Sequence, residues 1–136
     1  MKYLLDTNIL SEPTRPRPRL QVLQRMYEHR SEIAIPVPAW HELWFGCSGL
    51  NPSSRRRSIE RYLEDVLLAS FPILAYGRKE AEWHARERAR LVALGRTPPF
   101  VDGQIAAIAH ENGLTLVTSN SRDFRWFEGL TLESWT

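Results

Sequence analysis

With 136 residues, 43% of them hydrophobic and 25% charged, the chain has the length and composition of one globular domain. The only cysteine is Cys47, which excludes both a disulfide framework and a zinc–thiolate cluster. The net charge of +2 is too small to identify a nucleic-acid partner by itself. We therefore expect a single domain that covers residues 1–136.

The start of the chain does not resemble a targeting segment. Asp6 interrupts the first apolar residues too early for a signal peptide, and no apolar run approaches the roughly 20 residues that cross a bilayer. We expect a cytoplasmic protein that has no membrane partner.

The first half of the chain predicts two strands and three helices. The clearest helix carries an apolar stripe at helical spacing and begins near Ser53 or Ser54, either of which suits an N-cap. The stripe consists of Ile59, Tyr62, Leu63, Val66 and Leu67. In chain order we expect a strand over 2–5, a helix over 20–29, a strand over 32–37, a helix over 39–45 and a helix over 54–69.

The second half continues the alternation of strands and helices. We expect a strand over 71–76, a helix over 79–94 ended by Gly95, a helix over 102–112 ended by Gly113, and strands over 115–118 and 130–132. This order predicts an α/β fold with a mostly parallel central β-sheet flanked by helices on both faces. Such sheets carry their sites beyond the carboxyl ends of the strands.

Acidic and polar side chains fall where that rule predicts a site. Asp6 follows the first strand, and Glu42 lies one turn into the helix after the second strand. Asp102 opens a helix that must pack on the sheet, while Asn120 follows the strand that ends at Thr118. These groups are far apart in sequence, so only the topology brings them to one edge of the sheet.

Several acids at one edge require a counter-charge. Two carboxylates about 4 Å apart repel by about 4 kcal/mol at an effective dielectric constant of about 20. Clustered acids therefore shift their pKa values upward unless a cation joins them. Mg²⁺ and Mn²⁺ prefer oxygen ligands, and a bound ion of this kind activates water and polarises a phosphate.

Each acid also has a simpler interpretation. Asp6 and Asp102 suit the N-caps of the helices that follow them. Glu42 suits a solvated surface, although its large apolar neighbours predict a mostly buried segment. Those neighbours are Trp40, Leu43, Trp44 and Phe45. With Trp83, the aromatic residues among them favour core or dimer contacts over base stacking.

Arginines are concentrated in three clusters. Arg15, Arg17 and Arg19 follow the first acid closely and are candidates to contact an RNA backbone. The clusters 55–57 and 86–90 have the same composition. Solvated helix faces and loops are the alternative for all three.

Four segments resemble the motifs of PIN-domain nucleases, especially the VapC-type toxins of bacterial toxin–antitoxin pairs. The first is Leu4-Leu5-Asp6-Thr7-Asn8-Ile9-Leu10, and the second is Trp40-His41-Glu42-Leu43 with Gly46. The third is Asp102-Gly103-Gln104-Ile105-Ala106-Ala107, and the fourth runs from Leu116 to Phe124. The match covers nearly the whole chain with the motifs in the family's order.

The resemblance implies a metal-dependent endoribonuclease that acts as the toxin of such a pair. It implies Mg²⁺ or Mn²⁺ at Asp6, Glu42 and Asp102, with one or two ions activating water for in-line attack on a phosphodiester. The ribose 2′-hydroxyl is then not required. It also implies a VapB-like antitoxin, a homodimer, and contact with DNA only through the antitoxin.

The fourth acidic position is open. Many relatives have aspartate at the place of Asn120, whereas toxins often have Asn there and an acid three residues later, here Asp123. Asn120 and Asp123 are therefore both candidate catalytic residues, and Asp123 is also a candidate metal ligand. Its alternative role is to cap the turn before Phe124. Thr7, Asn8 and Thr118 are expected to line the same pocket.

Histidines do not suggest a metal-free mechanism. His29, His84 and His110 fall on separate predicted helices, and His41 points away from Glu42 because adjacent helical residues diverge by about 100°. We interpret His41 as structural.

Two other functions are compatible with parts of the sequence. A phosphatase of the haloacid dehalogenase type also opens with a strand and an aspartate, but it needs a second acid where this chain has Asn8. A catalytically weak PIN module that acts with its antitoxin as a co-repressor on DNA is the other. The phosphatase also needs a later catalytic lysine motif, which is not evident here, and the presence of Asp6, Glu42 and Asp102 favours an active nuclease over the weak module.

Overall fold

A computed structural model describes the whole chain, residues 1–136. Its centre is a five-stranded sheet in the order β3-β2-β1-β4-β5, and every neighbouring pair is parallel. The strands are β1 (Tyr3–Leu5), β2 (Ile33–Pro36), β3 (Ile73–Leu74), β4 (Thr115–Val117) and β5 (Leu132–Glu133). The predicted α/β fold with a parallel sheet is confirmed.

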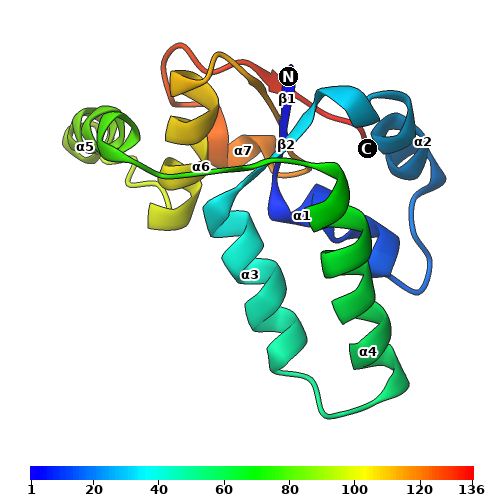
Figure 1. The fold of residues 1–136 in the computed structure, drawn as a ribbon. Helices are drawn as coiled ribbons and strands as arrows, with labels where there is room; N and C mark the ends of the chain where they lie inside the picture. Colours follow the sequence, from blue (N-terminus) through cyan, green and yellow to red (C-terminus); the bar gives the residue numbers. More distant parts are fainter.

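Helices cover the sheet on both faces, as the alternation predicted. In Figure 1, α5, α6 and α7 lie on one side of β1, and α1, α2 and α4 lie on the other. The α-helices are α1 (Thr7–Leu10), α2 (Leu20–Glu28), α3 (Val37–Ser48), α4 (Ser54–Arg61), α5 (Arg78–Ala93), α6 (Phe100–Glu111) and α7 (Ser121–Phe124). Two short 3₁₀ turns, η1 (Glu12–Thr14) and η2 (Arg30–Glu32), flank α2, and a π-type helix η3 (Tyr62–Leu68) continues α4.

One apolar core joins these layers. Twenty-nine buried hydrophobic residues form it, among them the whole of β1 and the run 105–109 of α6. The three central strands β1, β2 and β4 are short and mostly buried, so their apolar residues form continuous runs rather than an alternating pattern. This is why the strands could be placed from sequence to within two or three residues.

The predicted helix over 54–69 is one continuous helical segment with a change of winding. Ser53 is the N-cap, and its hydroxyl accepts a hydrogen bond from Arg56 N at 3.1 Å. The wider turns of η3 bury Leu63 and Leu67 but leave Val66 46% exposed. The predicted apolar stripe therefore does not face the core at Val66, because a π-type turn shifts side chains away from the 3.6-residue period.

Three boundaries differ from expectation near the carboxyl edge of the sheet. The strand expected over 71–76 is reduced to β3, and the four-residue helix α7 was not predicted, whereas α1 is the helix for which Asp6 was a candidate N-cap. The helix expected from Asp102 begins at Phe100 after Pro99, since proline is tolerated at a helix start. Asp102 therefore lies inside the first turn of α6 and makes no N-cap, so the capping interpretation of Asp102 was wrong.

No helix of the chain is long and apolar enough to span a membrane.

Candidate active site

The centre of the site is Asp6, which the sequence predicted directly after β1. Asp6 is 6% exposed and caps α1, since its Oδ1 accepts a hydrogen bond from Thr7 N at 2.8 Å. Its Oδ2 accepts a second one from the hydroxyl of Thr118, which follows the adjacent strand β4, at 2.8 Å. The capping role and the site role are thus compatible, because each carboxylate oxygen has a different partner.

Burial and hydrogen bonding have opposite effects on the pKa of Asp6. Burial raises the pKa of Asp6, while the hydrogen bonds from Thr118 and Thr7 lower it and the charge of Asp123 raises it again. The net result is a raised pKa. A buried carboxylate in this situation gains from a nearby positive charge.

Asp102 and Glu42 approach Asp6 from α6 and α3. Burial, followed by the charges of Asp6, Asp123 and Glu42, raises the pKa of Asp102 to about 7. The pKa of Glu42 is also raised, mainly because neighbouring protein atoms remove part of the water around its carboxyl group and also because of the charge of Asp6. The three acids and Asp123 therefore lie close enough to act on one another electrostatically.

A network of amides and hydroxyls closes the side of the site next to β4. Asn8 Nδ2 lies 3.4 Å from Asp6 Oδ2, and Asn8 Oδ1 accepts a hydrogen bond from Ser119 N at 3.3 Å. The amide N–H of Asn120 donates to Thr118 Oγ1 at 3.0 Å. The Asn120 side chain donates to the carboxylate of Asp123, so the two alternatives for the fourth position lie in direct contact.

The donor set fits a hard divalent cation held partly through water. No group of three histidine, cysteine, aspartate or glutamate side chains lies in a position to hold an ion directly. Mg²⁺, however, commonly binds through one or two carboxylates and retains several waters. The hydroxyl of Thr7 supports this, because it is buried beside the acids without a hydrogen-bond partner of regular geometry, although it lies close enough to Glu42 to favour the ionised carboxylate. A metal-bound water would satisfy it.

The surroundings of Glu42 differ from the expectation. Glu42 is exposed rather than set in a buried segment, and Phe45 is 75% exposed. Trp40 and Trp44 are half-buried and pack against the core, with their two rings edge-to-face and the ring centroids 6.1 Å apart, and Trp83 is buried. The helix α3 buries only one narrow face, so large apolar residues near Glu42 in sequence do not imply burial of the glutamate.

His84 and His110 lie outside the acid cluster, whereas His41 lies beside Glu42, where its charge lowers the pKa of that carboxyl group. His84 is buried under Tyr76, whose hydroxyl is 2.9 Å from His84 Nδ1, and His110 stacks on a tryptophan of α5. His41 is exposed and stacks on exposed Phe45 with ring centroids 6.1 Å apart, so it contributes nothing to the core.

Of the three arginines that follow Asp6, one uses its side chain in an ion pair within the protein. Arg15 forms an ion pair with buried Glu12 at 3.1 Å, and the same glutamate accepts a hydrogen bond from Arg19 N at 2.8 Å. Arg17 and the side chain of Arg19 are exposed. Arg15 therefore stabilises the loop before α2, while Arg17 and Arg19 face solvent.

Three hollows border the acid cluster, and they contain residues that the sequence did not single out. One of about 270 Å³ includes Glu42, His41, Tyr76 and Gln104, and one of about 260 Å³ includes Glu42, Thr7 and Arg55. A third of about 260 Å³ includes Asp123, Arg96, Arg122 and Trp126. The only sequence signal for the third was the position of Arg122 inside the fourth motif.

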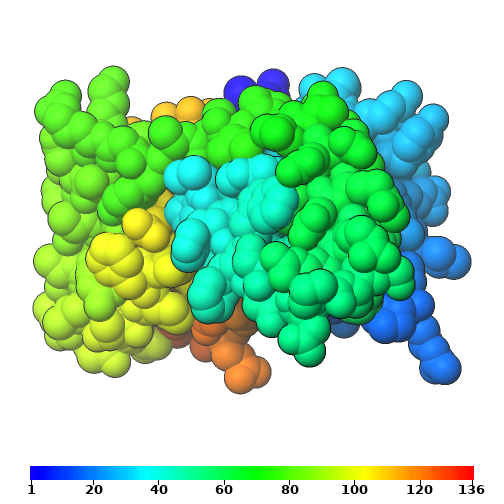
Figure 2. Space-filling model, turned by 60° about the horizontal axis from the view of Figure 1, so that its bottom comes forward, coloured from blue at the N-terminus to red at the C-terminus, as the bar shows by residue number.

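The carboxyl ends of the strands share one face of the molecule. β1 runs toward the bottom of Figure 1, and Figure 2 brings that side forward. On it, the first turns of α3 (cyan) lie beside the start of α6 (yellow), with the segment near residue 120 (orange) below them. The elements that carry Glu42, Asp102 and Asn120 thus meet on one accessible surface.

A parallel α/β sheet with a carboxylate cluster at its carboxyl edge defines the class of protein, one with an acidic site suited to a divalent cation. The model of the PIN domain family matches residues 3–129, and the chain belongs to that family. It is 31% identical over 135 residues to "Ribonuclease VapC2" of Haemophilus influenzae, covering 99% of this chain and 98% of the relative.

Two further comparisons agree with the family and the fold. A "tRNA(fMet)-specific endonuclease VapC" of Shigella flexneri is 27% identical over 136 residues, 100% of this chain and 99% of the relative. The crystal structure of VapBC2 from Rickettsia felis, bound to a DNA fragment from its promoter, contains a chain with a TM-score of 0.85 and 26% identity, and the match covers 100% of both chains.

Proposed function

We propose that this protein is a metal-dependent endoribonuclease, the toxin of a toxin–antitoxin pair, and that the whole chain acts as one nuclease domain in the cytoplasm. The observation that carries the proposal is the gathering of acids at the carboxyl edge of the sheet. A chain of hydrogen bonds through Thr118 and Asn120 links Asp6 to Asp123, and the charge of Asp6 raises the pKa values of Glu42 and Asp102. The names of the Haemophilus and Shigella relatives support RNA as the substrate. Transfer RNA is therefore the first substrate class to test.

The acids have different tasks in this proposal. Asp6 is the fixed ligand, since two hydrogen bonds hold its carboxylate in place. Asp102 and Glu42 complete the site from α6 and α3, and Asp123 is held beside it by Asn120. A bound Mg²⁺ or Mn²⁺ supplies a nucleophilic water and neutralises charge on the phosphate.

The uncharged residues keep that arrangement productive. Thr118 donates to Asp6 and accepts from the Asn120 amide, so it fixes the loop after β4 relative to β1. Asn8 holds the same loop through Ser119 N. Thr7 offers its free hydroxyl to a water molecule beside Glu42.

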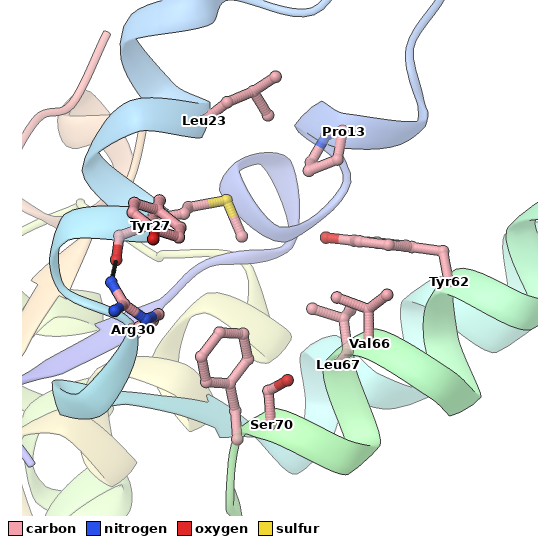
Figure 3. A pocket seen from close by; sticks show the side chains of 10 residues that line it. Pro13, Leu23, Tyr27, Arg30, Tyr62, Val66, Leu67 and Ser70 are labelled. Carbon is pink, nitrogen blue, oxygen red and sulfur yellow. Dashed lines mark hydrogen bonds between the residues drawn. The ribbon is translucent and has the colours of Figure 1, made fainter.

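A second surface suits the antitoxin. A groove of about 570 Å³ separates α2 from η3, and Figure 3 shows apolar side chains from the two helices facing each other across it. These include Leu23 and Tyr27 from α2 and Tyr62, Val66 and Leu67 from the facing segment. Tyr27 is 67% exposed, so an apolar segment of a partner would cover it. The Rickettsia structure, a VapBC2 assembly, supports such a partner.

The nuclease is tested with antitoxin-free protein on end-labelled cellular RNAs in Mg²⁺, in Mn²⁺ and in EDTA. We expect cutting that requires the metal and is lost in Asp6→Asn and in Asp102→Asn. Folded wild-type protein that cuts no RNA with either metal would favour the co-repressor function instead.

The antitoxin groove has a separate test. Tyr27→Glu should weaken binding of a VapB-like antitoxin at least tenfold, while RNA cleavage is unchanged. Unchanged antitoxin binding would remove the groove from the proposal. Light scattering of the purified chain tests the expected homodimer.

A further inference from the structure

A hollow beside Asp123 has a charge opposite to that of the acid cluster. Its polar lining comes from Arg96 and Thr97, in the loop between α5 and α6, and from Arg122 and Trp126, in and just after α7. Its volume is about 260 Å³, which is enough for a phosphate group with part of its ribose. Asp123 belongs both to this hollow and to the acid cluster.

Arg96 is held in place without using its hydrogen-bond donors. Its guanidinium carbon lies 3.6 Å from the ring centroid of Trp126, which is a close cation–π contact. Its backbone N–H donates to Leu91 O at 2.8 Å and fixes the loop at the end of α5. Stacking occupies the face of the guanidinium, so the N–H groups along its edge stay available for an anion.

Neither arginine of the hollow is neutralised by an acid. No ion pair or side-chain hydrogen bond involves Arg96 or Arg122, although Arg122 is next to Asp123 in sequence. By contrast, Arg90 on the adjacent helix is paired with Glu87 at 2.9 Å. The two free guanidinium groups therefore form a local positive site next to a negative one.

We propose that Arg96 and Arg122 bind one backbone phosphate of the RNA, next to the phosphate that is cut. This inference rests on the proposed ribonuclease function and names a substrate contact for it. Four carboxylates repel a polyanion, so a nuclease with this site needs cationic contacts close by to hold the strand. Arginine forks match phosphate oxygens with two hydrogen bonds, which sets the position of the strand as well as its affinity.

The test measures RNA binding separately from cleavage. A fluorescein-labelled single-stranded RNA is titrated with protein in EDTA at several NaCl concentrations, and log Kd is plotted against log [NaCl]. The proteins are wild type, Arg96→Gln, Arg122→Gln, the double variant, and Arg25→Gln as a control. Arg25 is exposed on α2 and makes no ion pair or side-chain hydrogen bond, so it removes the same charge elsewhere.

Each single variant should weaken binding about fivefold at 0.1 M NaCl. The double variant should reduce the salt slope by about 0.7, the value for one phosphate contact on a single strand. In Mg²⁺ the double variant should raise KM for RNA about tenfold and leave kcat within twofold. Arg25→Gln should change Kd and slope by much less, and all variants should stay folded at the assay temperature, although loss of the cation–π contact lowers the melting temperature of Arg96→Gln slightly.

A double variant with the Kd and salt slope of Arg25→Gln would overturn the phosphate site, even if wild-type protein cuts RNA. Wild-type protein that cuts no RNA would refute the nuclease, and the binding slopes would still decide the phosphate site. The two failures are therefore distinct.

Discussion

Replacement of Asp102 by Asn should stabilise the metal-free protein at pH 8. Burial and three neighbouring acids raise the pKa of Asp102 to about 7, well above its ordinary value of 3.8. The folded state therefore binds more protons than the unfolded state between these two values. The contribution of Asp102 to stability is therefore most favourable at low pH, falls as pH rises from about 4 to about 7, and stays low above that range. Asn cannot ionise and escapes this loss.

The magnitude follows from the size of the shift and the exposure of the group. About three pKa units correspond to about 4 kcal/mol at about 1.4 kcal/mol per unit for a fully shielded group. Asp102 is only half-buried, so solvent screening reduces the expected gain to about 1–2 kcal/mol. For a chain of 136 residues this raises the melting temperature by about 3–8 °C.

The assay is thermal or urea unfolding in EDTA at pH 8 and at pH 4.5. Asp102→Asn should exceed wild type at pH 8, and most of the difference should be gone at pH 4.5. Asp65→Asn is the control, since Asp65 is exposed on η3 outside the acid cluster, and it should stay within about 0.5 kcal/mol of wild type at both pH values. Equal stability of Asp102→Asn and wild type at pH 8 would refute the electrostatic account of the site.

The same unfolding assay in Mg²⁺ links stability to metal binding. At a free Mg²⁺ concentration 100 times its Kd, wild-type protein should gain about 2.7 kcal/mol, and Asp102→Asn should gain much less.

Two substitutions of uncharged residues test the structure around the acids. Thr118→Val removes a buried hydroxyl that donates to Asp6 at 2.8 Å, so urea unfolding should show a loss of about 1–3 kcal/mol, and an unchanged midpoint would contradict the bond. Gly103→Ala would place a methyl group 2.0 Å from Nε2 of buried His84, so the imidazole must move and stability should fall by about 1–3 kcal/mol. Gly46→Ala is its matched control, because nothing lies within 4 Å of the added carbon and the helix should gain up to about 1 kcal/mol; equal effects of the two alanines would refute the steric argument.

The fold was predictable because its main signals are local. Buried apolar runs marked β1 and β4, and the apolar body of α6 marked a helix that packs on the sheet. The alternation of strands and helices then restricted the sheet to a parallel one. The features that could not be predicted depend on small free-energy differences between local backbone conformations. Examples are the π-type winding of η3 and the start of α6 two residues before Asp102.

The site was predictable only in part, for a physical reason. Asp6 lies at the end of a central strand, and topology alone brings such a residue to the carboxyl edge. The Arg96 contact with Trp126 joins two loops that are 30 residues apart, so no periodicity in the sequence marks it. The same holds for Gly103, whose missing side chain makes room for His84 of α5.

The ion pairs of the other buried acids support a cation-binding role for the acids at the sheet edge. The fold pairs its other buried acids with arginines, Glu12 with Arg15 at 3.1 Å and Glu87 with Arg90 at 2.9 Å. The chain contains 18 lysines and arginines, so a shortage of cationic side chains does not explain why Asp6 has no cationic partner. Asp6 instead receives only neutral donors, namely a backbone N–H, a hydroxyl and the Asn8 side-chain amide, and faces other carboxylates. An arrangement that buries a carboxylate, raises its pKa and omits its counter-charge is costly for a structural residue and suits one whose counter-charge arrives from solution.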